Sequence, residues 1–159
     1  MSALRVGVIS DTHGSELAVE RAVAKLADAD AWFHLGDGAQ EASLLERLSG
    51  KPVYRVKGNC DYGAGEAEQT VTLGGVRILA SHGHLFGVQN GRDTLSYRAE
   101  ELCCKLALYG HTHVPLIEAW GGILLVNPGS AARPRGGKPR TIALVELRDG
   151  DAFPTILAL

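Results

Sequence analysis

The first sixty residues alternate between short apolar runs and longer stretches in which apolar residues recur every three or four positions. The apolar runs at 5–10, 31–35 and 53–56 predict buried strands, because each is short and almost free of charge. The first connection carries an apolar stripe with Ser15 as its predicted N-cap, and 41–48 predicts a second helix. Strands that alternate with helices in this way predict parallel pairing and an α/β architecture.

In the second half of the chain the predicted strands follow one another closely, with one helix among them. The segments 71–73 and 76–81 flank Gly74-Gly75, which indicates a hairpin, and one more helix is predicted near 93–104. Further strands are predicted at 106–109, 114–119, 123–126, 141–147 and 155–157. We expect this half to be mainly antiparallel, so the complete chain predicts two stacked sheets flanked by helices.

Length and composition are typical of one globular domain spanning residues 1–159, because 45% of the residues are hydrophobic and 21% are charged. A chain of this size buries roughly 68 to 70% of its unfolded surface on folding and needs no disulfide framework. Its three cysteines are an odd number without a C-x-x-C pair, which is typical of a reducing compartment. We therefore expect a cytoplasmic protein.

Charge and hydropathy exclude a membrane span and argue against nucleic acid as a partner. The longest apolar runs fall far short of the roughly 20 residues that a membrane span requires. A formal net charge of -2 argues against a broad electrostatic grip on nucleic acid or anionic lipid. We therefore expect a small substrate, while the exposed strand edges and the loop 133–140 leave room for a homo-oligomer.

Polar clusters stand at the ends of the predicted strands, and they hold five of the six histidines. The clusters are Asp11-Thr12-His13, Gly36-Asp37, Gly58-Asn59-Cys60-Asp61, Ser81-His82-Gly83-His84, Gly110-His111-Thr112-His113 and Asn127-Pro128-Gly129-Ser130. Imidazoles gathered with carboxylates and an amide form the ligand set of a divalent metal site. Seven good ligands are too many for one tetrahedral ion, whereas two ions bridged by Asp37 would use them all.

Less specific interpretations apply to several of these residues. Asn59 taken alone is typical of a left-handed turn, and it becomes a ligand candidate only through its neighbours. His34 is predicted to be a core or supporting histidine rather than a ligand. Arg133 and Arg135 could reach a substrate phosphate, but a solvated loop is the commoner role for such residues.

The ordered set D-x-H, G-D, G-N-x-D, H-G-H and G-H-T-H resembles the calcineurin-like metallophosphoesterase superfamily over residues 6–130. The small size of the chain and the turn at 127–130 look most like its compact bacterial and archaeal phosphodiesterase branch. The resemblance implies a four-layer α/β/β/α sandwich of two mixed sheets, with a dinuclear metal cleft at the strand ends.

The resemblance also implies a ligand set for each ion. Asp11, His13, Asp37 and His113 would hold one ion, and Asp37, Asn59, His82 and His111 would hold the other. A water bridging the two ions would lose its proton near neutral pH and attack phosphorus in line. Mixed nitrogen and oxygen ligands suit Mn2+, Fe2+, Ni2+ or Zn2+, and the family likeness favours Mn2+.

One position departs from the family pattern, since many relatives carry histidine where this chain has Cys60. That histidine is the usual proton donor to the leaving group, and a thiol serves less well near neutral pH. We therefore expect monoanionic diesters with good leaving groups to be favoured over monoesters. His84 is the other candidate acid, although both Cys60 and His84 also have purely structural interpretations, as a buried apolar group and as a supporting hydrogen-bonding residue.

The predicted function is a metal-dependent phosphodiesterase, a hydrolase acting on a small phosphodiester. Its catalytic candidates are Asp37, Asn59, Cys60 and His84. A phosphomonoesterase or nuclease using the same ions is the alternative within enzymes. A non-catalytic protein-interaction scaffold of the same fold is the alternative outside them.

Overall fold

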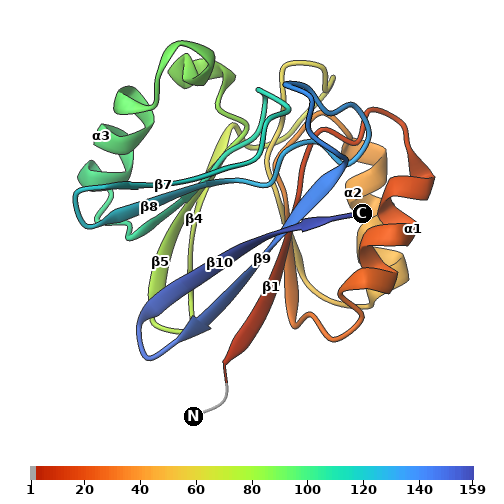
Figure 1. Ribbon diagram of the computed structural model, residues 1–159, viewed down its shortest axis with the longest axis horizontal. Coiled ribbons are helices and arrows are strands. Elements are labelled where there is room, and N and C mark those ends of the chain that lie inside the picture. The colour runs from red at the N-terminus through yellow and green to blue at the C-terminus, as the bar shows by residue number, and fades with distance from the viewer. Residues whose placement is uncertain (1–2) are drawn as a thin grey trace.

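Two five-stranded sheets form the middle of the molecule, with strand orders β10-β9-β1-β2-β3 and β4-β5-β6-β8-β7 (Figure 1). The computed structural model describes residues 3–159. The first sheet contains β1 (Leu4–Ile9), β2 (Ala31–His34), β3 (Val53–Arg55), β9 (Thr141–Arg148) and β10 (Asp151–Ala158). The second contains β4 (Glu68–Leu73), β5 (Val76–Ser81), β6 (Leu106–Leu108), β7 (Leu116–Trp120) and β8 (Ile123–Asn127). The helices are α1 (Glu16–Lys25), α2 (Ala39–Ser49) and α3 (Asp93–Glu101), with 3-10 turns η1 (His84–Phe86) and η2 (Val88–Asn90).

The parallel pairing predicted for the first sixty residues is confirmed. β1 pairs with β2, and β2 with β3, in parallel register. The Ser15 hydroxyl accepts a hydrogen bond from the Ala18 amide and so caps α1 as expected. The last two strands return to this sheet, because β9 lies antiparallel to β1 and β10 lies antiparallel to β9.

The expectation of a mainly antiparallel second half is only partly right. Antiparallel pairs form at β4/β5, β7/β8 and β9/β10, whereas β5, β6 and β8 are parallel to one another. The physical reason is the crossover through α3, which brings the chain back to the end of the sheet at which β5 begins, so β6 runs in the same direction as β5. β7 then occupies the edge beyond β8, so β8 can pair with β6. Both sheets are therefore mixed.

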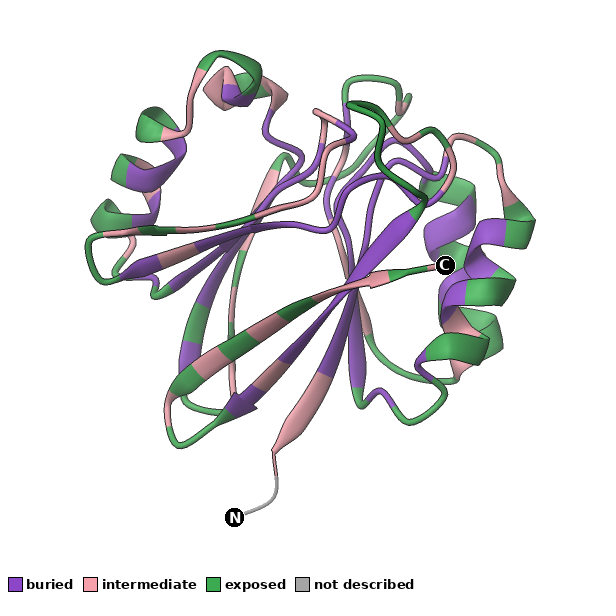
Figure 2. Cartoon of the chain, viewed as in Figure 1, coloured by how far each residue is buried: buried purple, intermediate pink, exposed green. Residues whose placement is uncertain are grey.

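Three apolar clusters lie between four layers of structure, which confirms the α/β/β/α sandwich. The central cluster joins Val8 and Phe33 of one sheet to Ile78 and Leu108 of the other. The two outer clusters pack α1 and α2 on the first sheet and α3 on the second. Figure 2 shows this burial along the strands and on the inner faces of the helices. Within the described residues, no helix is long and apolar enough to cross a membrane.

Loops from the two sheets meet at one end of the sandwich, opposite the described N-terminal end (Figure 1). A backbone hydrogen bond joins them across the sheets, because the Ala131 amide donates to the Ser10 carbonyl, while the Asp11 amide donates to Gly36 within the first sheet and the Gly110 amide to His82 within the second. A parallel arrangement places the carboxyl ends of the strands at a common edge, where polar side chains on the following loops converge. The polar clusters identified in the sequence lie at these strand ends and on the loops that follow them.

Candidate metal centre

Asp11, which follows β1, is fully buried, and only one of its two carboxylate oxygens accepts hydrogen bonds. Oδ2 accepts hydrogen bonds from the Ser10 hydroxyl at 2.6 Å and the His111 amide at 3.1 Å. Within the described chain, Oδ1 has no hydrogen-bond partner, although the Nε2 atom of His113 lies 3.1 Å away. A buried carboxylate oxygen without a hydrogen bond is costly unless a cation completes its surroundings.

Two histidines approach this oxygen and each other. The Nε2 atoms of His13 and His113 are 3.2 Å apart, and His13 Nε2 lies 3.7 Å from Asp11 Oδ1. Metal–nitrogen and metal–oxygen bonds of about 2.0 to 2.2 Å place atoms that share one ion about 3.0 to 3.5 Å apart. Asp11, His13 and His113 therefore have nearly the spacing of a coordination shell, and they form a group able to hold a metal ion.

Asp37, which follows β2, lies between this group and a second one. Its Oδ1 accepts a hydrogen bond from the Cys60 amide at 2.8 Å. Its Oδ2 lies 3.3 Å from the Nε2 atom of His82 and 3.8 Å from that of His13. One carboxylate thus faces histidines from both sheets.

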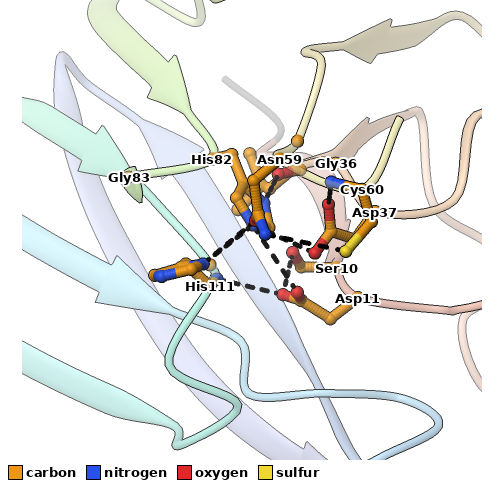
Figure 3. Close-up of polar contacts among 12 residues, drawn as sticks. Ser10, Asp11, Gly36, Asp37, Asn59, Cys60, His82, Gly83 and His111 are labelled. Carbon is orange, nitrogen blue, oxygen red and sulfur yellow. Dashed lines mark hydrogen bonds and ion pairs between the residues drawn. The ribbon is translucent and has the colours of Figure 1, made fainter. Parts of the chain in front are cut away.

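The second group extends from His82, after β5, toward the loops that follow β3 and β6. The Nδ1 atom of His111 lies 3.3 Å from His82 Nε2 and 3.2 Å from the side-chain oxygen of Asn59. Figure 3 shows these side chains converging with Asp11 and Asp37 from separate loops. The structure thus brings all seven predicted ligand residues together.

Carbonyl oxygens fix the protonation of two of these rings. His82 Nδ1 lies 2.7 Å from the Leu35 carbonyl, and His113 Nδ1 lies 2.6 Å from the Arg133 carbonyl. A carbonyl can only accept, so each Nδ1 donates its hydrogen. The Nε2 lone pairs of His82 and His113 then face the centre, which is the arrangement that metal-binding histidines use.

The loops that carry the centre have an unusual backbone. Seven non-glycine residues in the described chain have positive φ, and five of them belong to the centre. These are Asp11 (54°), His13 (40°), Asp37 (57°), His111 (72°) and His113 (62°). Such conformations cost of order 1 to 3 kcal/mol each and gather at functional sites. Here they turn successive side chains inward.

The electrostatics of the centre favour a positive charge beside Asp11 and Asp37. Burial raises the pKa of Asp11, but His113, His13, His82 and Ser10 together outweigh burial and hold that pKa well below its usual range. In the same way, burial lowers the pKa of His82, while Asp37 and Asp11 reverse the shift and raise it. The two carboxylates thus favour positive charge on the ring between them. A divalent cation would supply that charge and leave the ring nitrogens free to coordinate.

A buried network beneath Asp11 and His13 was missed in the sequence. Oε1 of Glu41 accepts hydrogen bonds from the Thr12 hydroxyl at 2.9 Å and the Gly14 amide at 2.7 Å. His34 Nε2 lies 3.0 Å from the same hydroxyl, which confirms the supporting role predicted for this ring. Glu41 lies on the buried face of α2. Its place beside Ala42 and Leu45 on that face was only a weak signal in the sequence, because an acidic residue in the first turn of a helix is ordinary.

The two candidate acids differ in their surroundings. Cys60 is exposed, so its interpretation as a buried apolar group is wrong. Partial desolvation and the nearby Asp37 both raise the pKa of its thiol, so the thiol keeps its proton at neutral pH. His84 is half-buried, its ring centroid lies 5.3 Å from that of His82, and its Nδ1 is buried without a hydrogen-bond partner in the described chain.

Two further clusters support the loops without facing the centre. Asp61 accepts hydrogen bonds from the backbone amides of Asp37, Gly38, Ala39 and Gly58. The Ser130 hydroxyl donates to the Asp11 carbonyl at 2.8 Å. Asp61 therefore ties the loop after β3 to the start of α2, and Ser130 holds the turn after β8 against the loop after β1.

Comparison with known proteins gives a consistent pattern. A family model described as a calcineurin-like phosphoesterase superfamily domain matches residues 4–150. The probable metallophosphoesterase YsnB of Bacillus subtilis is 36% identical over 152 residues, which cover 94% of this chain and 88% of YsnB. The phosphodiesterase YfcE of Escherichia coli K12 is 33% identical, covering 86% of this chain and 84% of YfcE. A crystal structure of a predicted phosphoesterase from Streptococcus pneumoniae TIGR4 superimposes with a TM-score of 0.86 at 34% identity, covering 99% and 91% of the two chains.

Proposed function

Because the chain belongs to the calcineurin-like phosphoesterase superfamily, we propose that it is a divalent-metal-dependent hydrolase that cleaves small phosphodiesters. The observation that carries the proposal is the buried Asp11 Oδ1, which has no hydrogen bond in the described chain and faces the Nε2 atoms of His13 and His113. A cation would coordinate this oxygen, and membership of a phosphoesterase family indicates that such a cation would act in phosphoester hydrolysis.

The donor set fits two ions, each with nitrogen and oxygen ligands. Asp11, His13, Asp37 and His113 would hold one ion, and Asp37, Asn59, His82 and His111 would hold the other. Asp37 is common to both sets because its Oδ2 faces His13 and His82. Ions bound here would polarise the phosphate and acidify a water molecule. Mn2+ is our proposal among Mn2+, Fe2+, Ni2+ and Zn2+, which all suit these ligands.

Residues around the ions supply orientation and protons. The carbonyls of Leu35 and Arg133 keep the rings of His82 and His113 in the tautomers that direct Nε2 inward. The Cys60 thiol and the His84 ring lie beside the second ligand group, and either can donate a proton to a departing alkoxide. Neither offers the strong acid of a protonated histidine paired with a carboxylate, which favours esters with good leaving groups.

The surface around the centre favours a diester over a monoester. Two cavities open beside the centre, and His13 and Gly14 line both. One has a volume of about 380 Å³ and reaches α1 and the loop after β8. The other, of about 470 Å³, is lined by Asp37, Cys60 and Tyr62. A phosphodiester held at the ions has two ester groups to place, and each cavity can receive one.

The proposal is tested by metal analysis together with substrate turnover. We expect about two Mn2+ ions per chain, and faster hydrolysis of bis(p-nitrophenyl) phosphate than of p-nitrophenyl phosphate. Asp37→Asn should lower kcat/KM by more than about 100-fold, because even outer partners of metal ligands contribute 10- to 100-fold. Asp149→Asn, the same change in a remote turn, is the matched control.

Three results would contradict parts of the proposal. A protein that binds no ion after Mn2+ loading would favour a non-catalytic scaffold. Faster turnover of the monoester would favour a phosphomonoesterase. Full activity in Asp37→Asn would remove Asp37 from the centre.

A further inference from the structure

The cavity of about 380 Å³ beside His13 has a distinctive lining. Arg21 of α1 and Arg133 and Arg140 of the segment between β8 and β9 all border it. We call this cavity the arginine pocket. Its apolar wall includes Leu17 and Leu159, and the C-terminus lies beside α1 in Figure 1.

The three arginines of the pocket have no carboxylate partner among the described residues. Arg5, Arg55, Arg92 and Arg98 each form an ion pair with aspartate or glutamate, and Arg47, Arg77, Arg135 and Arg148 have no carboxylate partner in the described chain either. What distinguishes Arg21, Arg133 and Arg140 is that they border one cavity. No aspartate or glutamate side chain lines the arginine pocket. Three arginine side chains therefore gather at a pocket without an acidic side chain, in a chain whose net charge is -2. Guanidinium groups bind paired phosphate oxygens well, because their donors form a planar fork.

The pocket is continuous with the proposed metal centre. His13 lines the pocket, while its Nε2 faces His113 in the centre. Arg133 contributes its side chain to the pocket and its carbonyl to the ring of His113. A substrate whose phosphodiester group sits at the centre therefore extends one of its ester groups directly toward the arginines.

We propose that the arginine pocket binds a second phosphate group carried by the substrate. This inference rests on the proposed function, and it narrows the substrate to a small phosphodiester in which one of the two alcohols is itself phosphorylated. The three charges match a phosphate dianion, and Leu17 and Leu159 contact the carbon skeleton between the two phosphates. The volume of about 380 Å³ accommodates one small unit such as a nucleoside, because ligand pockets commonly span roughly 300 to 1,000 Å³.

A matched pair of chromogenic substrates tests the inference. Thymidine 5′-(p-nitrophenyl phosphate) and its 3′-phosphorylated form share the scissile bond and leaving group and differ only in the second phosphate. We expect the 3′-phosphorylated form to have a kcat/KM at least about tenfold higher, because hydrogen bonds to charged groups contribute about 1.5 to 3 kcal/mol. A ratio near one in the unmodified protein would overturn the inference.

Substitutions then assign the preference to the pocket. Arg21→Ala, Arg133→Ala and Arg140→Ala should each lower the ratio about three- to tenfold, and Arg21→Glu should abolish the preference. Two matched controls remove exposed positive charge outside the pocket: Lys25→Ala on the same helix and Arg135→Ala on the same loop as Arg133. An equal loss in the controls, or an unchanged ratio in Arg21→Glu, would overturn the assignment.

Calorimetric binding separates failure of the pocket from failure of the proposed function. Thymidine 3′,5′-bisphosphate should bind the Mn2+-loaded protein more tightly than thymidine 5′-phosphate does, and Arg21→Glu should remove the difference. If neither chromogenic substrate is hydrolysed but this difference is present, the proposed activity is wrong and the pocket assignment stands. Equal binding of the two nucleotides contradicts the pocket even where both substrates are hydrolysed.

Discussion

Glu41 is a buried carboxylate that touches neither of the proposed ions and yet holds the loop that supplies two of their ligands. Its Oε1 accepts hydrogen bonds from Thr12 and Gly14, which flank His13. The loop is strained by the positive φ angles of Asp11 and His13. Hydrogen bonds to Glu41 therefore offset part of that strain and fix the direction of the side chains.

We predict that Glu41→Ala lowers the free energy of unfolding by about 1 to 3 kcal/mol, because it leaves the Thr12 hydroxyl and the Gly14 amide without a partner. Mn2+ affinity should fall as well, by about 10- to 100-fold, the range measured for partners that orient ligands. Glu41→Gln keeps a carbonyl oxygen at the same place and should restore most of both losses. Denaturant unfolding and Mn2+ titration measure them, and equal loss in the two variants would contradict a positioning role.

His34 gives a second prediction at this scale, through pH. Burial lowers the pKa of its ring to about 4, from an ordinary 6.5. As pH falls from about 6.5 toward 4, the His34 ring binds a proton in the unfolded chain but stays neutral in the folded chain. The free energy of unfolding therefore decreases with falling pH, by about 2 kcal/mol between pH 7 and pH 5 from this group.

The contribution of His34 is isolated by comparison with His34→Gln, because other groups titrate in both proteins. Urea unfolding across pH 5 to 7 should show a smaller fall in stability for His34→Gln than for the unmodified chain. Nuclear magnetic resonance of the His34 ring supplies a direct check. A titration midpoint near 6.5 would contradict the prediction.

The ligand residues could be predicted from the sequence because they stand at the ends of apolar strands. A polar residue next to a buried strand is costly unless it has a partner, so such residues indicate a functional site. Glu41 could not be singled out so easily. An acidic residue in the first turn of a helix is ordinary, since it interacts favourably with the helix dipole. Only the packing of α2 against the loop after β1 shows that this carboxylate faces inward.

At the scale of elements, close approach of two loops sets where Asp37 can lie. Gly58 follows β3, and a Cβ atom placed on it would stand 2.1 Å from Asp37 Oδ1 and 2.5 Å from the Asp37 amide nitrogen. Its absence lets the loops after β2 and β3 touch. The Cys60 amide can then hold Asp37 Oδ1, which turns Oδ2 toward the histidines.

We predict that Gly58→Ala displaces the Asp37 carboxylate and lowers kcat/KM by about 100-fold, the loss that a misplacement near 1 Å can cause. Gly122→Ala is the control, because a Cβ atom there meets no other atom within 4 Å. Steady-state kinetics with bis(p-nitrophenyl) phosphate and metal content by mass spectrometry are the measurements. A Gly58→Ala protein with normal metal content and normal turnover would show that the contact does not position Asp37.

The elements themselves were predicted better than their pairing. Apolar periodicity predicted each β-strand and α-helix. However, β6 has only three residues, and so short an apolar run is equally typical of a parallel and an antiparallel strand. The helix between β5 and β6 is a signal of a parallel crossover that the expectation of an antiparallel second half overlooked. No comparable signal predicted the pairing of β6 with β8, because β7 lies between them in the sequence but occupies the edge of the sheet in the structure.

At the scale of the whole molecule, the candidate ligands come from both sheets. Asp11, Asp37 and Asn59 follow strands of the first sheet, whereas His82, His111 and His113 follow strands of the second. Apolar packing holds the two sheets together along most of their length. At the loop end, polar groups and strained backbone face each other instead, so this end gains most from ions shared between the sheets.

We therefore predict that Mn2+ raises the Tm of the whole molecule. Ligand at 100 times its Kd stabilises the folded state by about 2.7 kcal/mol, which for a chain of this size corresponds to a rise of about 5 to 10 °C. Excess EDTA should reverse the rise. Asp37→Asn should fold and show a much smaller response, because it weakens the one ligand that both ion sites share, whereas Asp149→Asn should respond like the unmodified chain. Scanning calorimetry with and without Mn2+ measures all three proteins, and an equal rise in Asp37→Asn would mean that the ions bind elsewhere.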